Sequence, residues 1–267
     1  MVSKSDTLGP RVSAPILVDR IYKSTRGGLA LRANRGSLTT YEAVSFNEAF
    51  RPAHIFKLAG APSRTRVSKS GKLGASTVFV TGDSYNSGGF STRTTIYNVA
   101  AGSIVADLED FKIEREGRSW KKADFNFWGV TFAPDDETFY ATLFSGQMPY
   151  LIRGSISKRQ AVVIHDHVEC PSLSPNGKMI AFKSRETIQT RRIWLLKVLD
   201  LSTGVVSSTQ EQRNVDDQPE WMDDARIAYS LPHERGAGSD IWAVSITSGK
   251  MPELIIPDAY SPCVVIP

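Results

Sequence analysis

Ten polar and aromatic residues fall where short β-patterned segments of the chain begin. Asp124, Asn126 and Trp128 occupy alternate positions of DFNFWGV (124–130), and HDHVECPS (165–172) and VDDQPEW (215–221) carry further carboxylates. Carboxylates and guanidinium groups beside aromatic surfaces orient polar ligands through charge-assisted hydrogen bonds. The sequence therefore predicts a ligand-binding site formed by Arg20, Arg66, Asp124, Asn126, Trp128, Glu169, Asp216, Asp217, Glu220 and Tyr260. The alternative is that these charges pair with one another and join neighbouring sheets.

A second pattern, H-x-H-x-E, is formed by His165, His167 and Glu169. Alternation along a strand would place all three side chains on one face, which suits a metal ion. However, one short segment supplies no further group to orient the two imidazoles. We therefore predict no metal site and no cofactor, and interpret His165 as the end of an outer strand.

Cys170 precedes Pro171, and Cys263 follows Pro262. A nucleophilic cysteine needs a nearby base that lowers its pKa, and His167 is the only histidine near Cys170 in the sequence. Small buried thiols are the favoured interpretation. Two cysteines permit one disulfide without implying it, so their pairing stays open.

Signatures of hydrolases and nucleotide-binding proteins are missing from the sequence, which has no G-x-S-x-G, P-loop or G-x-G-x-x-G. The glycine-containing segment 83–95 does not run from a strand into a helix, so we interpret it as a hairpin loop rather than a phosphate cradle. Residues 109–128 form a long connection of mixed charge. We expect this connection to be exposed, with Trp120 as a candidate contact residue.

The composition indicates a globular protein. The chain has 267 residues, of which 41% are hydrophobic and 22% charged, so it can fill a core and is not disordered or collagen-like. Residues 1–100 hold 14 Lys and Arg against 5 Asp and Glu, whereas the remainder holds 18 against 23. The basic residues are scattered singly, which favours a solvated basic face over nucleic-acid binding.

No stretch approaches the roughly 18 consecutive apolar residues of a membrane span. The first 18 residues also lack the basic segment and apolar core of an export signal. As written, the sequence predicts a cytoplasmic protein with no membrane span.

The elements that must position these side chains are β-strands. Period-2 runs such as KMIAFKS (178–184) and RIAYSLP (226–232) alternate with turn residues, and no convincing helical pattern is found. PSLSPNGKMIAFKS (171–184) recurs as PEWMDDARIAYS (219–230), and Gly177 and Asp224 lie 47 residues apart. This repeat length is that of one four-stranded propeller blade.

The repeats predict an all-β, single-domain β-propeller (1–267) of about six four-stranded blades. Five blades are expected near 18–60, 62–111, 124–165, 168–212 and 216–256. Residues 258–266 would begin a sixth, incomplete blade, closed by a strand from the N-terminal segment 10–17. An incomplete blade leaves an open edge, which would permit a homodimer through that blade.

Several motifs are shared with one known family. They are GPR and DRIY (within 9–22), FSTRTT (90–95), DFNFWGVTF (124–132), FYATL (139–143), VECPSLSP (168–175), IAFK (180–183), VLDL (198–201), VDDQPEW (215–221) and DAYSP (258–262). The chain resembles the TolB-like (PD40, WD40-related) β-propellers, and most closely an actinobacterial TolB-like family. This resemblance implies a binding or scaffolding role and a secreted or extracytoplasmic location.

Two functional hypotheses follow. The first is a noncatalytic module that recognises a polar small molecule, a peptide or a protein at the mouth of the central channel. The alternative is a small-metabolite enzyme, such as a hydrolase, lyase or cyclase, that uses the channel carboxylates as acid and base.

Overall fold

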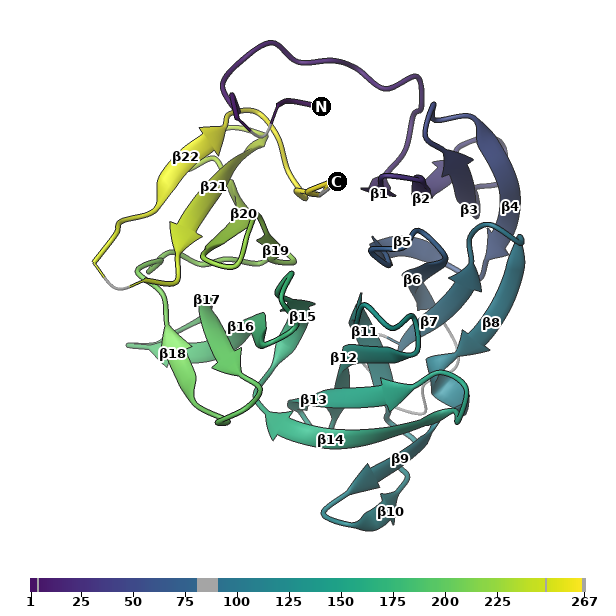
Figure 1. Cartoon of the computed structure of the whole chain (residues 1–267), viewed down its shortest axis with the longest axis vertical. Helices are drawn as coiled ribbons and strands as arrows, with labels where there is room; N and C mark the ends of the chain where they lie inside the picture. Colours follow the sequence, from purple (N-terminus) through teal and green to yellow (C-terminus); the bar gives the residue numbers. More distant parts are fainter. Residues whose placement is uncertain (4, 81–90, 248, 266–267) are drawn as a thin grey trace. The chain divides into compact units, whose positions relative to one another are not determined.

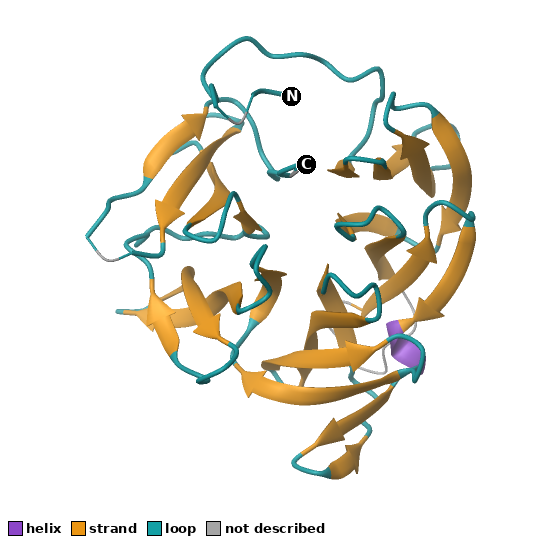
Figure 2. Ribbon diagram, viewed as in Figure 1, coloured by secondary structure: helices purple, strands orange, loops and turns teal. Residues whose placement is uncertain are grey.

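Antiparallel β-sheets make up nearly all of the regular structure. The computed structural model describes residues 1–3, 5–80, 91–247 and 249–265. Within these residues the single helix is the 3-10 turn η1 (Leu108–Asp110), and the remaining elements are strands (Figure 2). The prediction of an all-β chain is confirmed. Most of the predicted loop 83–95 lies outside the described residues, and its last residues belong to a strand.

The chain divides into two compact units. The three-sheet unit is formed by Pro15–His167 with Val265, and the two-sheet unit by Met1–Ala14 and Val168–Val264. Four of the described sheets have the meandering strand order of a propeller blade, and the remaining sheet contains such a blade with a hairpin added to it.

The three-sheet unit begins with two four-stranded sheets (Figure 1). The first contains β1 (Arg20–Ser24), β2 (Gly27–Asn34), β3 (Thr40–Asn47) and β4 (Pro52–Leu58). The second contains β5 (Ala61–Val67), β6 (Leu73–Val80), β7 (Ser91–Asn98) and β8 (Ser103–Asp107).

The third sheet of this unit has six strands in the order β10-β9-β14-β13-β12-β11. Its blade is formed by β11 (Asn126–Phe132), β12 (Thr138–Ser145), β13 (Met148–Ser155) and β14 (Gln160–Asp166). The hairpin of β9 (Lys112–Arg115) and β10 (Arg118–Trp120) is added at the outer edge, where β9 pairs in parallel with β14. Part of the connection that we expected to be an exposed excursion therefore extends this sheet.

The two-sheet unit holds the remaining blades. One contains β15 (Glu169–Leu173), β16 (Met179–Ile188), β17 (Arg191–Asp200) and β18 (Val206–Ser208). The other contains β19 (Glu220–Trp221), β20 (Arg226–Pro232), β21 (Ser239–Ser245) and β22 (Glu253–Ile256). Trp221 connects the two sheets, because its indole Nε1 donates a 2.8 Å hydrogen bond to the Ser172 carbonyl and its ring lies in the buried core.

First strands carry a recurring irregularity. The register shifts between Trp128 and Thr131 in β11 and between Glu169 and Ser172 in β15. Each shift contains a residue in the left-handed backbone region, Gly129 at φ 64° and Cys170 at φ 50°. Such bulges change the direction in which side chains point at the start of a strand. Trp128 and Glu169 each directly precede the bulge of a first strand, so they occupy equivalent places in their blades.

The prediction of six blades is wrong, because the residues that the structure describes form five. Within the described part of the segment 258–266 no strand forms: Asp258 and Ser261 adopt positive φ values of 47° and 55°, and Pro262 has no amide proton to donate. The described segment 10–17, which contains Pro10 and Pro15, forms no strand either. An incomplete closing blade is therefore not supported, and the predicted homodimer loses its structural argument. That the whole chain is one domain stays a prediction.

The sequence predicts that the chain has no membrane span. No helix among them is long and apolar enough to cross a membrane.

Candidate functional site

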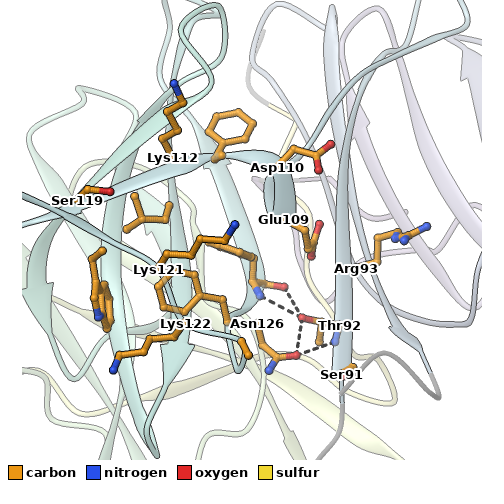
Figure 3. Close-up of a pocket in the computed structure, with 16 residues that line it drawn as sticks. Ser91, Thr92, Arg93, Glu109, Asp110, Lys112, Ser119, Lys121, Lys122 and Asn126 are labelled. Atoms are coloured by element: carbon orange, nitrogen blue, oxygen red, sulfur yellow. Dashed lines mark hydrogen bonds between the residues drawn. The ribbon is translucent and has the colours of Figure 1, made fainter. Parts of the chain in front are cut away.

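A pocket of about 620 Å³ lies in the three-sheet unit, beside η1 and the β9–β10 hairpin (Figure 3). Its walls come from the start of β7, from η1, from both hairpin strands and from the segment that leads into β11. Pockets that take small organic ligands usually enclose about 300–1,000 Å³. The volume therefore suits a small molecule.

Aromatic side chains form one wall of the pocket. The ring of Trp120 lies 4.8 Å from that of Phe125 and 5.2 Å from that of Tyr150, both in edge-to-face geometry. The guanidinium of Arg115 stacks 5.3 Å from the Trp120 ring and 4.8 Å from the Tyr150 ring. Because these contacts hold the indole on several sides, Trp120 presents a fixed apolar surface.

Glu109, the central residue of η1, provides a carboxyl group in this pocket. Its Oε1 accepts a 2.9 Å hydrogen bond from the Thr94 amide. The residue is exposed, although protein atoms lie close around its carboxyl group. This desolvation raises the pKa of Glu109 to about 8, since burial disfavours the charged form.

Asn126 is the one predicted site residue that lines this pocket. Its Oδ1 accepts a 2.8 Å hydrogen bond from the Thr92 amide, and its Nδ2 donates one of 3.2 Å to the Asp124 carbonyl. Both ends of the amide are thus engaged, and Asn126 fixes β11 against β7.

The rim of the pocket is basic. Lys112, Lys121 and Lys122 are exposed and line it together with Arg93. In Figure 3, Glu109, Thr92 and Asn126 lie on one side of the view, whereas Lys112 and Lys122 lie on the other. The arrangement can attract an anion and place its apolar part against aromatic rings.

Another cavity, of about 670 Å³, lies in the two-sheet unit beside β20, β21 and β22. Its described lining contains no aromatic side chain. The carboxylate of Asp223 there pairs with Arg226 at 2.8 Å. The pocket beside η1 is the better candidate because it combines an aromatic wall with a carboxyl group of raised pKa.

The other predicted residues of the three-sheet unit have structural partners. Arg20 donates a 2.9 Å hydrogen bond from Nε to the Ser63 carbonyl, which joins β1 to β5. Arg66 is 6% exposed and stacks 5.1 Å from the ring of Tyr22. Trp128 is 9% exposed and packs against Phe144.

Asp124 secures the turn between β12 and β13. Its two carboxylate oxygens accept hydrogen bonds from the Ser145 hydroxyl at 2.8 Å and the Gly146 amide at 2.7 Å. Although burial opposes the shift, these bonds hold the pKa of Asp124 below its usual range. The carboxylate therefore stays charged at neutral pH.

In the two-sheet unit, Glu169 and Asp216 belong to one network. Oε1 of the buried Glu169 accepts bonds from Arg185 at 3.0 Å and from the indole of Trp194 at 3.1 Å. Nζ of Lys183 lies 5.2 Å from the centre of the Trp194 ring and 2.6 Å from Asp216 Oδ1. Each of these carboxylates therefore pairs with a basic side chain outside the ten predicted residues, Glu169 with Arg185 and Asp216 with Lys183.

Asp217 and Glu220 hold the C-terminal segment. Oδ2 of Asp217 accepts a short hydrogen bond from the Ser230 hydroxyl, and that hydroxyl oxygen accepts one from the Ser261 amide at 3.3 Å. Glu220 Oε1 accepts a 3.2 Å bond from the Val264 amide. Tyr260 lies in the same segment and is 55% exposed. That all ten predicted residues line one channel mouth stays a prediction.

The sequence missed Glu109 as a site residue. The signal that could have indicated it is the long connection 109–128, which begins at this carboxylate and supplies Trp120 and the three lysines of the rim.

The remaining candidates for chemistry are the two cysteines and the histidines of the H-x-H-x-E pattern. Neither Cys170 nor Cys263 forms a disulfide. Nδ1 of His165 lies 2.6 Å from the Asp166 carbonyl. Among the described residues, neither His165 nor His167 belongs to a group of three side chains that could hold a metal ion.

Comparisons with known proteins identify the fold. No family model matches the chain, and no curated protein matches its sequence. Several solved structures match. The match to TolB from Acinetobacter baumannii has 15% sequence identity, covers 82% of this chain and 49% of the TolB chain, and has a TM-score of 0.56. The β-propeller domain of the Trilobed protease from Pyrococcus furiosus matches at 9% identity, covering 89% and 70%, with a TM-score of 0.52. An oligogalacturonate lyase matches at 6% identity, covering 84% and 63%, with a TM-score of 0.53.

These likenesses show a β-propeller fold. The chain spans about half the length of the TolB structure that it matches. The neighbours include a protease domain and a lyase, so the shared fold alone assigns no activity.

Proposed function

We propose that this protein is a noncatalytic binding protein for a small organic anion with a flat, apolar body. The observation that carries the proposal is the pocket of about 620 Å³ beside η1, which combines a fixed indole with a rim of lysines. A noncatalytic role agrees with the absence of catalytic motifs from the sequence, and with the binding role that the resemblance to actinobacterial TolB-like proteins implies.

The charges of the pocket favour an anion. Lys112, Lys121 and Lys122 contribute positive charge at the rim. Glu109 is mostly neutral at pH 7 because its pKa is raised to about 8, so it opposes an anion only weakly and can donate an O–H to it. Arg93 adds a further positive charge and Asp110 a negative one, so the basic side chains of the lining outnumber the carboxylates.

The aromatic wall favours a flat body. Trp120 and Phe125 meet edge to face, and both are partly exposed beside the cavity. A planar ring placed against the indole would bury apolar surface at about 25 cal/mol per Å². The ligand class is thus an aromatic carboxylate, sulfonate or phosphate of small size.

One observation favours the enzyme alternative as a second candidate. A carboxyl group with a pKa near 8 can both donate and accept a proton at neutral pH, and Glu109 has this property. The pKa of Asp124, in contrast, is lowered, which argues against Asp124 as a general acid. Glu109→Gln separates the two roles, because a binding protein keeps its affinity within a few fold whereas an acid–base enzyme loses turnover.

The test uses 1-anilinonaphthalene-8-sulfonate, an aromatic sulfonate whose fluorescence rises on binding. We expect one saturable site in the folded protein, with affinity reduced at least fivefold by Trp120→Ala and by Lys121→Glu. Lys178→Ala is the control, since Lys178 is exposed in the two-sheet unit. Equal affinity in all four proteins would refute the proposed pocket. Lys121→Glu tests the pocket even if Trp120→Ala fails to fold, because replacing an exposed lysine removes few packing contacts.

A further inference from the structure

Three metal-ligating side chains meet in the two-sheet unit, and none of them lines the pocket already described. His233 directly follows β20, Asp240 lies in β21, and Asp258 follows β22. Residues separated by up to 25 positions are thus gathered at one end of a single blade, because β20, β21 and β22 are neighbours in that sheet.

The distances between their ligand atoms fit one small cation. Nε2 of His233 lies 3.0 Å from Oδ1 of Asp240 and 3.8 Å from Oδ1 of Asp258. All three ligand atoms lie within 4.8 Å of one another. An ion bound at about 2.0–2.2 Å from each ligand places tetrahedral neighbours about 3.3–3.6 Å apart. Small side-chain movements reach that geometry.

The surroundings of His233 restrict its imidazole. The ring interacts with the backbone of Ala237 as well as with Asp240. Further contacts of a histidine ring help to orient metal-binding imidazoles. Gly238 is needed beside the ring, since a Cβ at that position would lie 2.9 Å from Cε1 of His233.

The backbone also fixes Asp258. Its amide donates a 2.9 Å hydrogen bond to Oδ1 of Asp240, and Arg11 donates to its carbonyl at 3.2 Å. The Ala259 amide bonds the Ser239 carbonyl at 2.7 Å. The turn that carries the third ligand is therefore tied to the strand that carries the second.

We propose that His233, Asp240 and Asp258 bind a divalent first-row transition metal ion, with Zn²⁺ as the best fit. One imidazole nitrogen and two carboxylates suit Zn²⁺ or its neighbours better than Mg²⁺ or Ca²⁺, which prefer oxygen ligands. The side chains of His233 and Asp240 are 25% and 24% exposed and that of Asp258 is 79% exposed. Water can therefore complete the coordination, which leaves a position that can be exchanged.

The experiment is isothermal titration calorimetry. Zn²⁺ is titrated into the full chain after the protein has been treated with a chelator and desalted. We expect one equivalent to bind to the wild-type protein, and binding at least tenfold weaker in Asp258→Asn and in His233→Gln. Asparagine suits the positive φ of 47° at position 258, so the first variant keeps the turn. Zn²⁺ should also raise the melting temperature of the wild-type protein but not that of Asp258→Asn.

His165→Gln is the matched control, because it removes a histidine of the H-x-H-x-E pattern. It should bind Zn²⁺ as the wild-type protein does. The proposal is overturned if the wild-type protein takes up no Zn²⁺, which would leave His233 and Asp240 as an ion pair. It is equally overturned if Asp258→Asn binds with unchanged affinity, or if His165→Gln alone loses binding.

Discussion

The backbone amide of Thr94 donates a hydrogen bond of 2.9 Å to Oε1 of Glu109, and so fixes a carboxyl group of η1 against strand β7. The surrounding protein raises the pKa of this carboxyl to about 8. A group of this kind links the ionisation of the pocket to the stability of the blade, since the folded state holds its proton more tightly than the unfolded chain does.

Replacement of Glu109 by Gln should change how stability depends on pH. The pKa rises from 4.5 in the unfolded chain to about 8 in the folded one, so the folded state binds more protons between these values. Stability contributed by the protonated form is complete below pH 4.5 and is lost as the pH rises toward 8. Glu109→Gln removes this loss. The melting temperature of the variant minus that of the wild-type protein should therefore increase from pH 5 to pH 8. If the melting temperatures of the variant and the wild-type protein change in parallel across this pH range, the raised pKa of Glu109 is contradicted.

Gly129→Ala should destabilise the third sheet. Gly129 has φ 64° inside the bulge of β11, where a side chain costs about 1–2 kcal/mol. We expect the free energy of unfolding, measured with urea, to fall by about that amount. Gly36→Ala is the control, because the nearest atom to its added Cβ lies 3.9 Å away. A loss at Gly36 as large as at Gly129 would be inconsistent with backbone strain as the cause.

Glu169→Ala should lower the free energy of unfolding by about 2–3 kcal/mol, since it leaves a partly buried guanidinium and an indole N–H without their acceptor. Glu169 is 5% exposed and accepts from both Arg185 and Trp194. Glu169→Gln keeps an acceptor oxygen and should lose less. Urea denaturation of both variants checks the order, and equal losses would mean that the hydrogen bonds contribute little.

Glu220→Ala should loosen the C-terminal segment. Glu220 Oε1 accepts from the Val264 amide at 3.2 Å, and loss of this acceptor should speed hydrogen exchange in a peptide that spans 258–265. Glu253→Ala, an exposed change on β22, should leave that peptide unaffected. If both variants exchange at the wild-type rate, the segment is held by other contacts.

Much of the fold could be predicted from the sequence because blades repeat. Period-2 patterns and turns such as 175–178 recur at the length of a blade, and alternation of apolar residues reports which strands are half-buried. The number of blades could not be predicted in this way. Residues 258–264 carry β-prone side chains, yet the positive φ angles of Asp258 and Ser261 and the missing amide proton of Pro262 prevent pairing.

The candidate site was less predictable. The predicted site was placed at strand starts because polar residues such as Asp124, Glu169 and Asp217 occur there, but each of these three has a structural partner on the chain. Glu109 begins the long connection 109–128, but it belongs to no catalytic motif in the sequence. Its raised pKa comes from packing of η1 against β7, which only a three-dimensional structure reveals.

The most direct test of the proposed pocket is hydrogen–deuterium exchange of the full chain with and without 1-anilinonaphthalene-8-sulfonate at saturation. The proposal predicts slower exchange in peptides that cover 109–113 and 119–127, and no change at 215–221. Protection centred on 215–221, with 109–127 unchanged, would contradict the pocket and return the binding site to the predicted channel mouth.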